Sequence, residues 1–145
     1  MQITSSGLLQ NDTVKAALRS AWGDSEPGIA GGHEEGGFVL QSSSNEIFVE
    51  RWPVGVQNKI SVPLHDNCRI HENDILASFH THPNTGPNFL QEPSATDKRA
   101  VRDDPNLKGD LYVGEFVIAN DLIYLIQPDG EVLEMGSRHE FFEES

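Results

Sequence analysis

Two histidines lie two positions apart in the segment Phe79-His80-Thr81-His82-Pro83. The segment is typical of a strand, in which alternate residues share a face, so both imidazoles are expected on one face about 7 Å apart. Asp97 follows in Ser94-Ala95-Thr96-Asp97, a pattern typical of a helix start, and its carboxylate can turn toward the strand. Two histidines and one aspartate leave the fourth position of a tetrahedral metal ion for water, as in a hydrolytic zinc site.

A hydrolytic site also needs a general base, and the segment His33-Glu34-Glu35-Gly36-Gly37 offers two carboxylates at the start of a predicted strand. The flanking glycines allow other groups to approach closely. An acidic pair is often only solvated surface, and two histidines on a strand are often only structural. Ser94 is equally suited to cap a helix and to donate a hydrogen bond in a cleft. These alternatives stay open at the level of single motifs.

In combination, Glu34-x-x-Gly37, His80-Thr81-His82-Pro83 and Ser94-x-x-Asp97 resemble the signature of the JAMM (MPN+) zinc metalloprotease family, in its bacterial branch. The resemblance implies His80, His82 and Asp97 as Zn²⁺ ligands, Glu34 as the general base and acid, and Ser94 as the donor to the oxyanion. Glu34 is preferred to Glu35 because the family places its glutamate three residues before the glycine. The implied activity is that of a peptidase or isopeptidase acting on a protein or peptide, with ubiquitin-like conjugates among the candidates.

The loop from Pro83 to Pro93, between His82 and Ser94, is longer than the commonest spacing of the family. The entropic cost of closing a loop grows slowly with its length, so we expect the longer loop to leave the site intact. We also expect this loop to border the cleft and contact the substrate. Two other functions stay open: a non-enzymatic MPN-like interaction module, and a zinc hydrolase or effector domain that acts on another amide.

Helices and strands must position these residues. The order of the predicted helices and strands indicates an α+β fold, with a central mixed or antiparallel sheet flanked by helices. The resemblance implies the MPN architecture, which is similar to cytidine deaminase. The acidic tail Ser137–Ser145 is expected to fray, although Phe141 and Phe142 could dock. The patterns predict helices over Thr13–Trp22 and Ala95–Arg102, and strands over Gly37–Gln41, Glu46–Trp52, Lys59–Pro63, Ile75–His82, Gly114–Ala119, Leu122–Gln127 and Glu131–Met135.

Composition limits the partners and the compartment. The 145 residues suit a single domain over 1–145, and a net charge of −13 disfavours nucleic acid and anionic membranes as partners. The single cysteine, Cys68, cannot form an internal disulfide, which favours a reducing compartment. The sequence contains neither a signal-peptide pattern nor an apolar run long enough to cross a bilayer, so we expect a cytoplasmic protein. The oligomeric state stays open.

Overall fold

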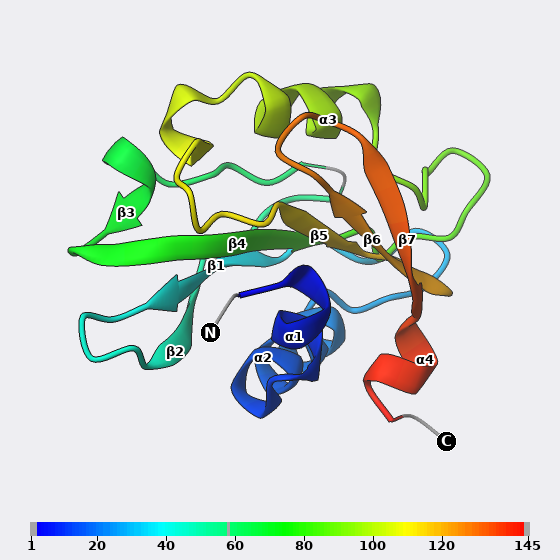
Figure 1. The fold of residues 1–145 in the computed structure, drawn as a ribbon. Helices are drawn as coiled ribbons and strands as arrows, with labels where there is room; N and C mark the ends of the chain where they lie inside the picture. Colours follow the sequence, from blue (N-terminus) through cyan, green and yellow to red (C-terminus); the bar gives the residue numbers. More distant parts are fainter. Residues whose placement is uncertain (1–2, 58, 144–145) are drawn as a thin grey trace.

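The computed structural model describes residues 3–57 and 59–143, and within them seven strands form one mixed sheet that four α-helices cover (Figure 1). The α+β class and the mixed sheet are therefore confirmed. None of the described helices is both long enough and apolar enough to cross a membrane. The strands are β1 Gly36–Gln41, β2 Ile47–Arg51, β3 Arg69–Ile70, β4 Asn73–Thr81, β5 Glu115–Ile118, β6 Leu122–Ile126 and β7 Val132–Ser137. The helices are α1 Ser5–Gln10, α2 Asp12–Asp24, α3 Ala95–Arg102 and α4 Arg138–Phe141, with 3₁₀ turns η1 Asp66–Cys68 and η2 Pro105–Leu107.

The sheet has the strand order β2-β1-β4-β5-β6-β7, and β3 pairs with the first residues of β4. β4 and β5 are parallel, whereas the other strand pairs are antiparallel. A parallel pair needs a crossover connection, and the chain between β4 and β5 supplies it through α3. β4 therefore has an antiparallel neighbour, β1, on one side and a parallel neighbour on the other.

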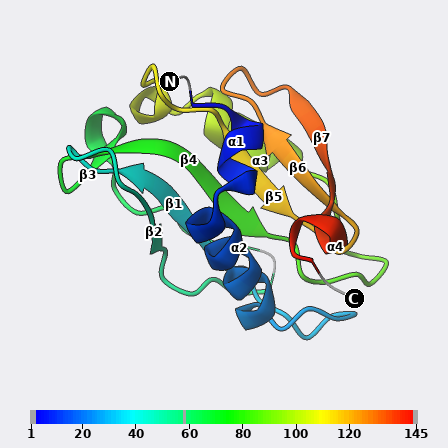
Figure 2. The same cartoon turned by 60° about the horizontal axis from the view of Figure 1, so that its bottom comes forward.

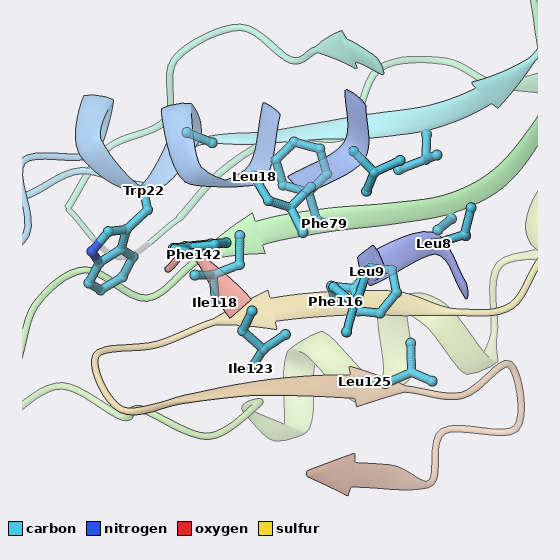
Figure 3. Close-up of a cluster of buried hydrophobic side chains, with 14 of the residues drawn as sticks. Leu8, Leu9, Leu18, Trp22, Phe79, Phe116, Ile118, Ile123, Leu125 and Phe142 are labelled. Atoms are coloured by element: carbon cyan, nitrogen blue, oxygen red, sulfur yellow. The ribbon is translucent and has the colours of Figure 1, made fainter. Parts of the chain in front are cut away.

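Helices cover both faces of the sheet, with α1, α2 and α4 on one face and α3 on the other (Figures 1 and 2). Three apolar residues of α2, Val14, Leu18 and Ala21, recur at helical spacing and are fully buried. The core on this face consists of large side chains from helices and strands, including Leu9, Leu18, Trp22, Phe79, Phe116, Ile118, Ile123 and Phe142 (Figure 3). The core on the α3 face includes Phe38, Leu40, Trp52, Ile75, Val101, Leu107 and Val117.

The crossover brings the carboxyl end of β4 to the amino end of α3. His80 lies near the end of β4, and His82 follows its last residue, with its N–H bonded to the carbonyl of Ile118 at 2.8 Å. Asp97 lies in the first turn of α3. In α/β structures, ligand sites commonly form where a strand ends and the neighbouring connections diverge. The fold thus places the three predicted ligands at one edge of the sheet.

Most of the predicted elements are confirmed to within about two residues, but the prediction of a strand over Lys59–Pro63 is wrong. Lys59 makes only an isolated bridge to Val56, and the residues after it are irregular. This segment runs over the α3 face, where half-buried Ile60 packs against the core, so it does not join the sheet. Helix α1 and strand β3 were not predicted, because each is too short to show a period. The side chain of Thr4 caps α1 by accepting the N–H of Gly7.

The expectation that the tail frays is wrong for its described part, up to Glu143; residues 144–145 lie outside the described residues. β7 continues to Ser137, whose side chain caps α4 by accepting the N–H of Glu140. The expected docking of Phe142 is confirmed, because its ring is only 1% exposed within the α2-side core. Phe141 is partly buried against the same core. The gain from burying an aromatic ring outweighs the acidity of the tail.

Candidate metal centre

Three side chains converge where β4 ends and α3 begins. The Nε2 atoms of His80 and His82 lie 3.2 Å apart, and Oδ2 of Asp97 is 3.5 Å from the first and 3.2 Å from the second. Both imidazoles are buried, whereas the Asp97 side chain is partly exposed. The three ligand atoms form a compact triangle that is open to the surface on the aspartate side.

The opposite nitrogen of each imidazole has a fixed partner. Nδ1 of His80 lies 2.8 Å from a carboxylate oxygen of Glu115, and Nδ1 of His82 lies 3.1 Å from the backbone carbonyl of Gln91. Both partners are acceptors, so each Nδ1 carries the hydrogen and donates it. In the neutral ring, this leaves the lone pair of Nε2 facing the triangle, which is the tautomer that a metal requires.

The spacing of the triangle matches a tetrahedral metal. Zinc binds imidazole nitrogen and carboxylate oxygen at about 2.0–2.1 Å, so two ligands of one tetrahedral ion lie roughly 3.3 Å apart. The three observed separations are 3.2, 3.2 and 3.5 Å. Two imidazoles and one carboxylate are a donor set that zinc accepts, and other divalent metals accept it too. The residues present therefore fit a divalent ion.

Asp97 is held in place by the start of its own helix. The hydroxyl oxygen of Ser94 accepts the N–H of Asp97 at 3.0 Å, and Oδ2 of Asp97 accepts the N–H of Ser94 at 2.9 Å. These reciprocal bonds form a capping box, which satisfies two of the free N–H groups at the start of α3. The same Oδ2 atom faces both histidines, so the cap also orients the carboxylate.

Glu34 lies just before β1, and its backbone is fixed by the segment that follows β2. Its N–H donates to the carbonyl of Val56 at 2.8 Å, and its carbonyl accepts the N–H of Gly55 at 2.9 Å. The side chain is buried and lines the same cavity as His82, Ser94 and Asp97. Burial raises the pKa of Glu34 above its ordinary value, although the nearby histidines oppose the change.

The neighbouring carboxylate, Glu35, has a different environment. Its two oxygens bind the guanidinium of Arg51 and the ring of His33, each at 2.6 Å, and its N–H donates to the hydroxyl of Thr81. The structure therefore separates the two glutamates: Glu34 lines the cleft, and Glu35 links β1 to β2 and β4. Gly36, the next residue, pairs with His80 across the sheet, and a Cβ atom there would collide with the Trp52 ring.

The charges of the centre favour a cation. Burial lowers the pKa of His80, but the charges and hydrogen bonds of Glu115 and Asp97 outweigh it and hold that pKa well above its ordinary value. Burial acts to raise the pKa of Asp97, but the hydrogen bonds that the protonated rings of His80 and His82 donate from Nε2 hold it well below its ordinary value. Positive charge is thus stabilised at the point where the three ligand atoms meet.

Two cavities meet at the triangle, and Glu34, Ser94 and Asp97 line both of them. The first, of about 240 Å³, is bordered by the loop after His82; the second, of about 460 Å³, lies between α3 and the segment after β2. The expectation that the Pro83–Pro93 loop borders the cleft is confirmed. The first cavity is further lined by Gln57, Pro83, Asn84, Asn88, Phe89 and Leu90, and the second by Trp52, Lys59, Ile60, Val62, Val101 and Leu107, among others.

The long loop is fastened at both ends. The buried amide of Asn84 accepts the N–H of Gly32 at 2.7 Å and donates to the carbonyls of Gly32 and Gln57. The Gln91 side chain donates to the carbonyl of Asn84 at 2.6 Å and accepts the N–H of Asn120 at 3.1 Å. These bonds fix the Gln91 carbonyl that holds His82.

The motifs did not predict Glu115, Gln91 or Asn84. Glu115 had a sequence signal, because it is the one acid in the apolar run Glu115-Phe116-Val117-Ile118 of a predicted strand. A charge within a buried strand needs a partner. Gln91 acts on His82 through its backbone carbonyl, which every residue possesses, so no side-chain pattern could have predicted it.

No protein-family model matches the chain, and no curated protein matches it. The resemblance to the JAMM family therefore depends on the sequence motifs alone.

Proposed function

We propose that the protein is a zinc-dependent hydrolase of peptide or isopeptide bonds, of the JAMM type and with the MPN architecture. The observation that carries the proposal is the convergence of two anchored imidazoles and one capped carboxylate at metal-ligand spacing, with Glu34 lining the same cleft. His80, His82 and Asp97 would hold the ion. Bound zinc supplies Lewis-acid polarisation of the scissile carbonyl and lowers the pKa of a coordinated water to about 7.

The role of Glu34 is to move the proton. Its carboxylate accepts a proton from the attacking water and returns it to the departing amine. The raised pKa that burial gives this carboxyl makes it a stronger base than an exposed glutamate. Its backbone is fixed by two hydrogen bonds, so the side chain is held at the cleft.

The role of Ser94 is to stabilise the carbonyl oxygen as it gains negative charge. The oxygen of Ser94 accepts the Asp97 N–H, so the hydroxyl keeps its own hydrogen for donation. Because the cap fixes the hydroxyl oxygen before substrate arrives, only rotation of its hydrogen is needed to donate to the carbonyl oxygen.

The surroundings of the cleft support a protein or peptide substrate. The two cavities share Glu34, Ser94 and Asp97 in their lining but differ in the rest of it, and a cleft of two connected parts suits a chain that continues on both sides of the scissile bond. Exposed apolar side chains border these cavities, among them Val62 at 43% and Leu90 at 56% exposure. Ubiquitin-like conjugates are candidates within this class. We place the reaction in the cytoplasm, where the free thiol of Cys68 stays reduced.

The test is cleavage of ubiquitin-like fusions, linear and isopeptide-linked, by the zinc-loaded protein. Glu34→Gln should retain the metal and lose a factor of about 10²–10⁴ in turnover, the usual share of general acid–base catalysis. Glu35→Gln is the matched control: it removes the negative charge that pairs with Arg51 and His33, so it should lower stability but preserve activity per folded molecule. Equal losses in both variants, or cleavage that persists after metal removal, would contradict the proposal.

A further inference from the structure

A line of buried polar side chains leads from Tyr112 to the metal ligand His80. The hydroxyls of Tyr112 and Ser78 lie 2.7 Å apart, and Ser78 donates to Oε1 of Glu115 at 2.8 Å. The other carboxylate oxygen, Oε2, lies 2.8 Å from Nδ1 of His80. All four residues are buried, at 7% exposure or less. Such a line is costly to bury unless every member is paired, and here every member is.

The parallel pairing of β4 and β5 creates this arrangement. Ser78 faces Glu115 in the register of the two strands, and His80 lies two residues after Ser78, on the same face. One carboxylate therefore reaches both side chains of β4 with its two oxygens. A shift of the register by one residue would turn Glu115 to the opposite face.

Every hydrogen bond in this line is donated toward Glu115. Ser78 has one hydroxyl hydrogen, which it gives to the carboxylate, so the Tyr112 hydroxyl is the donor to Ser78. His80 donates to Glu115 from the other side. The carboxylate is thus fixed from two directions, and it in turn fixes the plane of the His80 ring.

We propose that Glu115, held by Ser78 and through it by Tyr112, is a positioning residue that sets the affinity of the site for its metal ion. The inference rests on the proposed metal centre. A carboxylate on the far nitrogen orients a ligating imidazole and strengthens it as a donor. The far nitrogen of His82 faces the neutral backbone carbonyl of Gln91 and not a carboxylate. His80 is therefore the stronger of the two imidazole ligands.

The experiment is a competition for Zn²⁺ between the full chain and a chromophoric chelator at fixed pH. Glu115→Gln, which keeps the shape but removes the charge, should raise the zinc dissociation constant about 10- to 100-fold. Tyr112→Phe should raise it by ~2- to 5-fold, the share of one hydrogen bond. The matched control is Asp104→Asn, which alters a second His–carboxylate pair, His65–Asp104 at 2.6 Å, that contains no metal ligand. It should leave the zinc affinity unchanged.

Wild-type affinity in Glu115→Gln would overturn the inference, as would an equal loss in Asp104→Asn, because the effect would then be a general one on the fold. If Glu115→Gln does not fold, Tyr112→Phe decides: an unchanged zinc affinity in that variant overturns the inference. If the wild-type protein itself takes up no zinc, the proposed metal centre fails, and the inference fails with it.

Discussion

At the residue scale, Asp97 uses one oxygen for two purposes. Oδ2 accepts the N–H of Ser94 to close the cap of α3, and the same atom faces the Nε2 atoms of both histidines. A carboxylate oxygen has more than one lone pair, so the two uses are compatible. The alternative readings of Ser94-x-x-Asp97, helix cap and functional site, therefore describe the same geometry.

Ser94→Ala separates the two roles of Ser94. Alanine keeps the backbone N–H that orients Asp97 but loses the hydroxyl that accepts from it. We expect a loss of about 1 kcal/mol in the free energy of unfolding, from the cap, and a fall of about 10²–10³ in kcat, from the oxyanion donor. Thermal melts and turnover per folded molecule measure the two effects. An unchanged kcat would show that Ser94 is a cap only.

Glu34 should lower the stability of the metal-free protein at neutral pH. Burial raises its pKa above the ordinary 4.5, so the folded state disfavours the charged carboxylate. Glu34→Gln should therefore be more stable than wild type above the raised pKa. The difference in the free energy of unfolding should shrink as pH falls through that value. It should vanish below about 4.5, where Glu34 is protonated in both the folded and the unfolded state. Chemical denaturation in a chelator across this pH range is the measurement; a variant less stable than wild type at pH 7 contradicts it.

At the element scale, most residues of the site belong to the connection between β4 and β5. It supplies His82 at its start, the fastened loop with Gln91, and α3 with Asp97 in its first turn. β1 and the segment after β2 add Glu34 from the other side of β4. The site is therefore built on a strand end and a helix start, which are rigid, and the loop between them is held by hydrogen bonds.

Phe142 should anchor the last helix. Its ring is 1% exposed among the residues that α2 packs on the sheet, so Phe142→Ala should lower the free energy of unfolding by about 3–4 kcal/mol. Phe141→Ala is the matched control, because this neighbouring ring is only partly buried and should cost much less. Denaturant unfolding curves give both values, and equal costs would mean that α4 is not docked as described.

The elements that sequence patterns predicted are those with a clear period or a capping signal. Ala95–Arg102 has Ser94 as its cap and is found with those bounds, and β4 has a long apolar run. The segment Lys59–Pro63 shows strand-like residues, but whether it pairs depends on a free sheet edge that local sequence does not encode. Similarly, motif spacing could predict the three converging ligands, but the partners Glu115 and Gln91 arise from register and loop path.

At the scale of the whole molecule, an acidic chain places three carboxylates around one pair of imidazoles. The net charge is −13, and the carboxylates of Glu34, Asp97 and Glu115 all lie near the two imidazoles. A bound divalent cation would offset part of this charge, and the folded state, which assembles the three ligands, binds it more tightly than the unfolded state. We therefore expect zinc to raise the melting temperature and a chelator to lower it, with a smaller response in Glu115→Gln at limiting zinc.

The measurement that tests the account most directly is the metal content of the purified, zinc-reconstituted protein by elemental analysis. The account predicts close to one zinc per chain, lost in His82→Ala because the triangle then has two ligands in place of three. Retention of zinc in Glu34→Gln is the control, because that side chain is placed as a base and not as a ligand. A wild-type protein without metal, or a His82→Ala variant that keeps its zinc, would contradict the assignment.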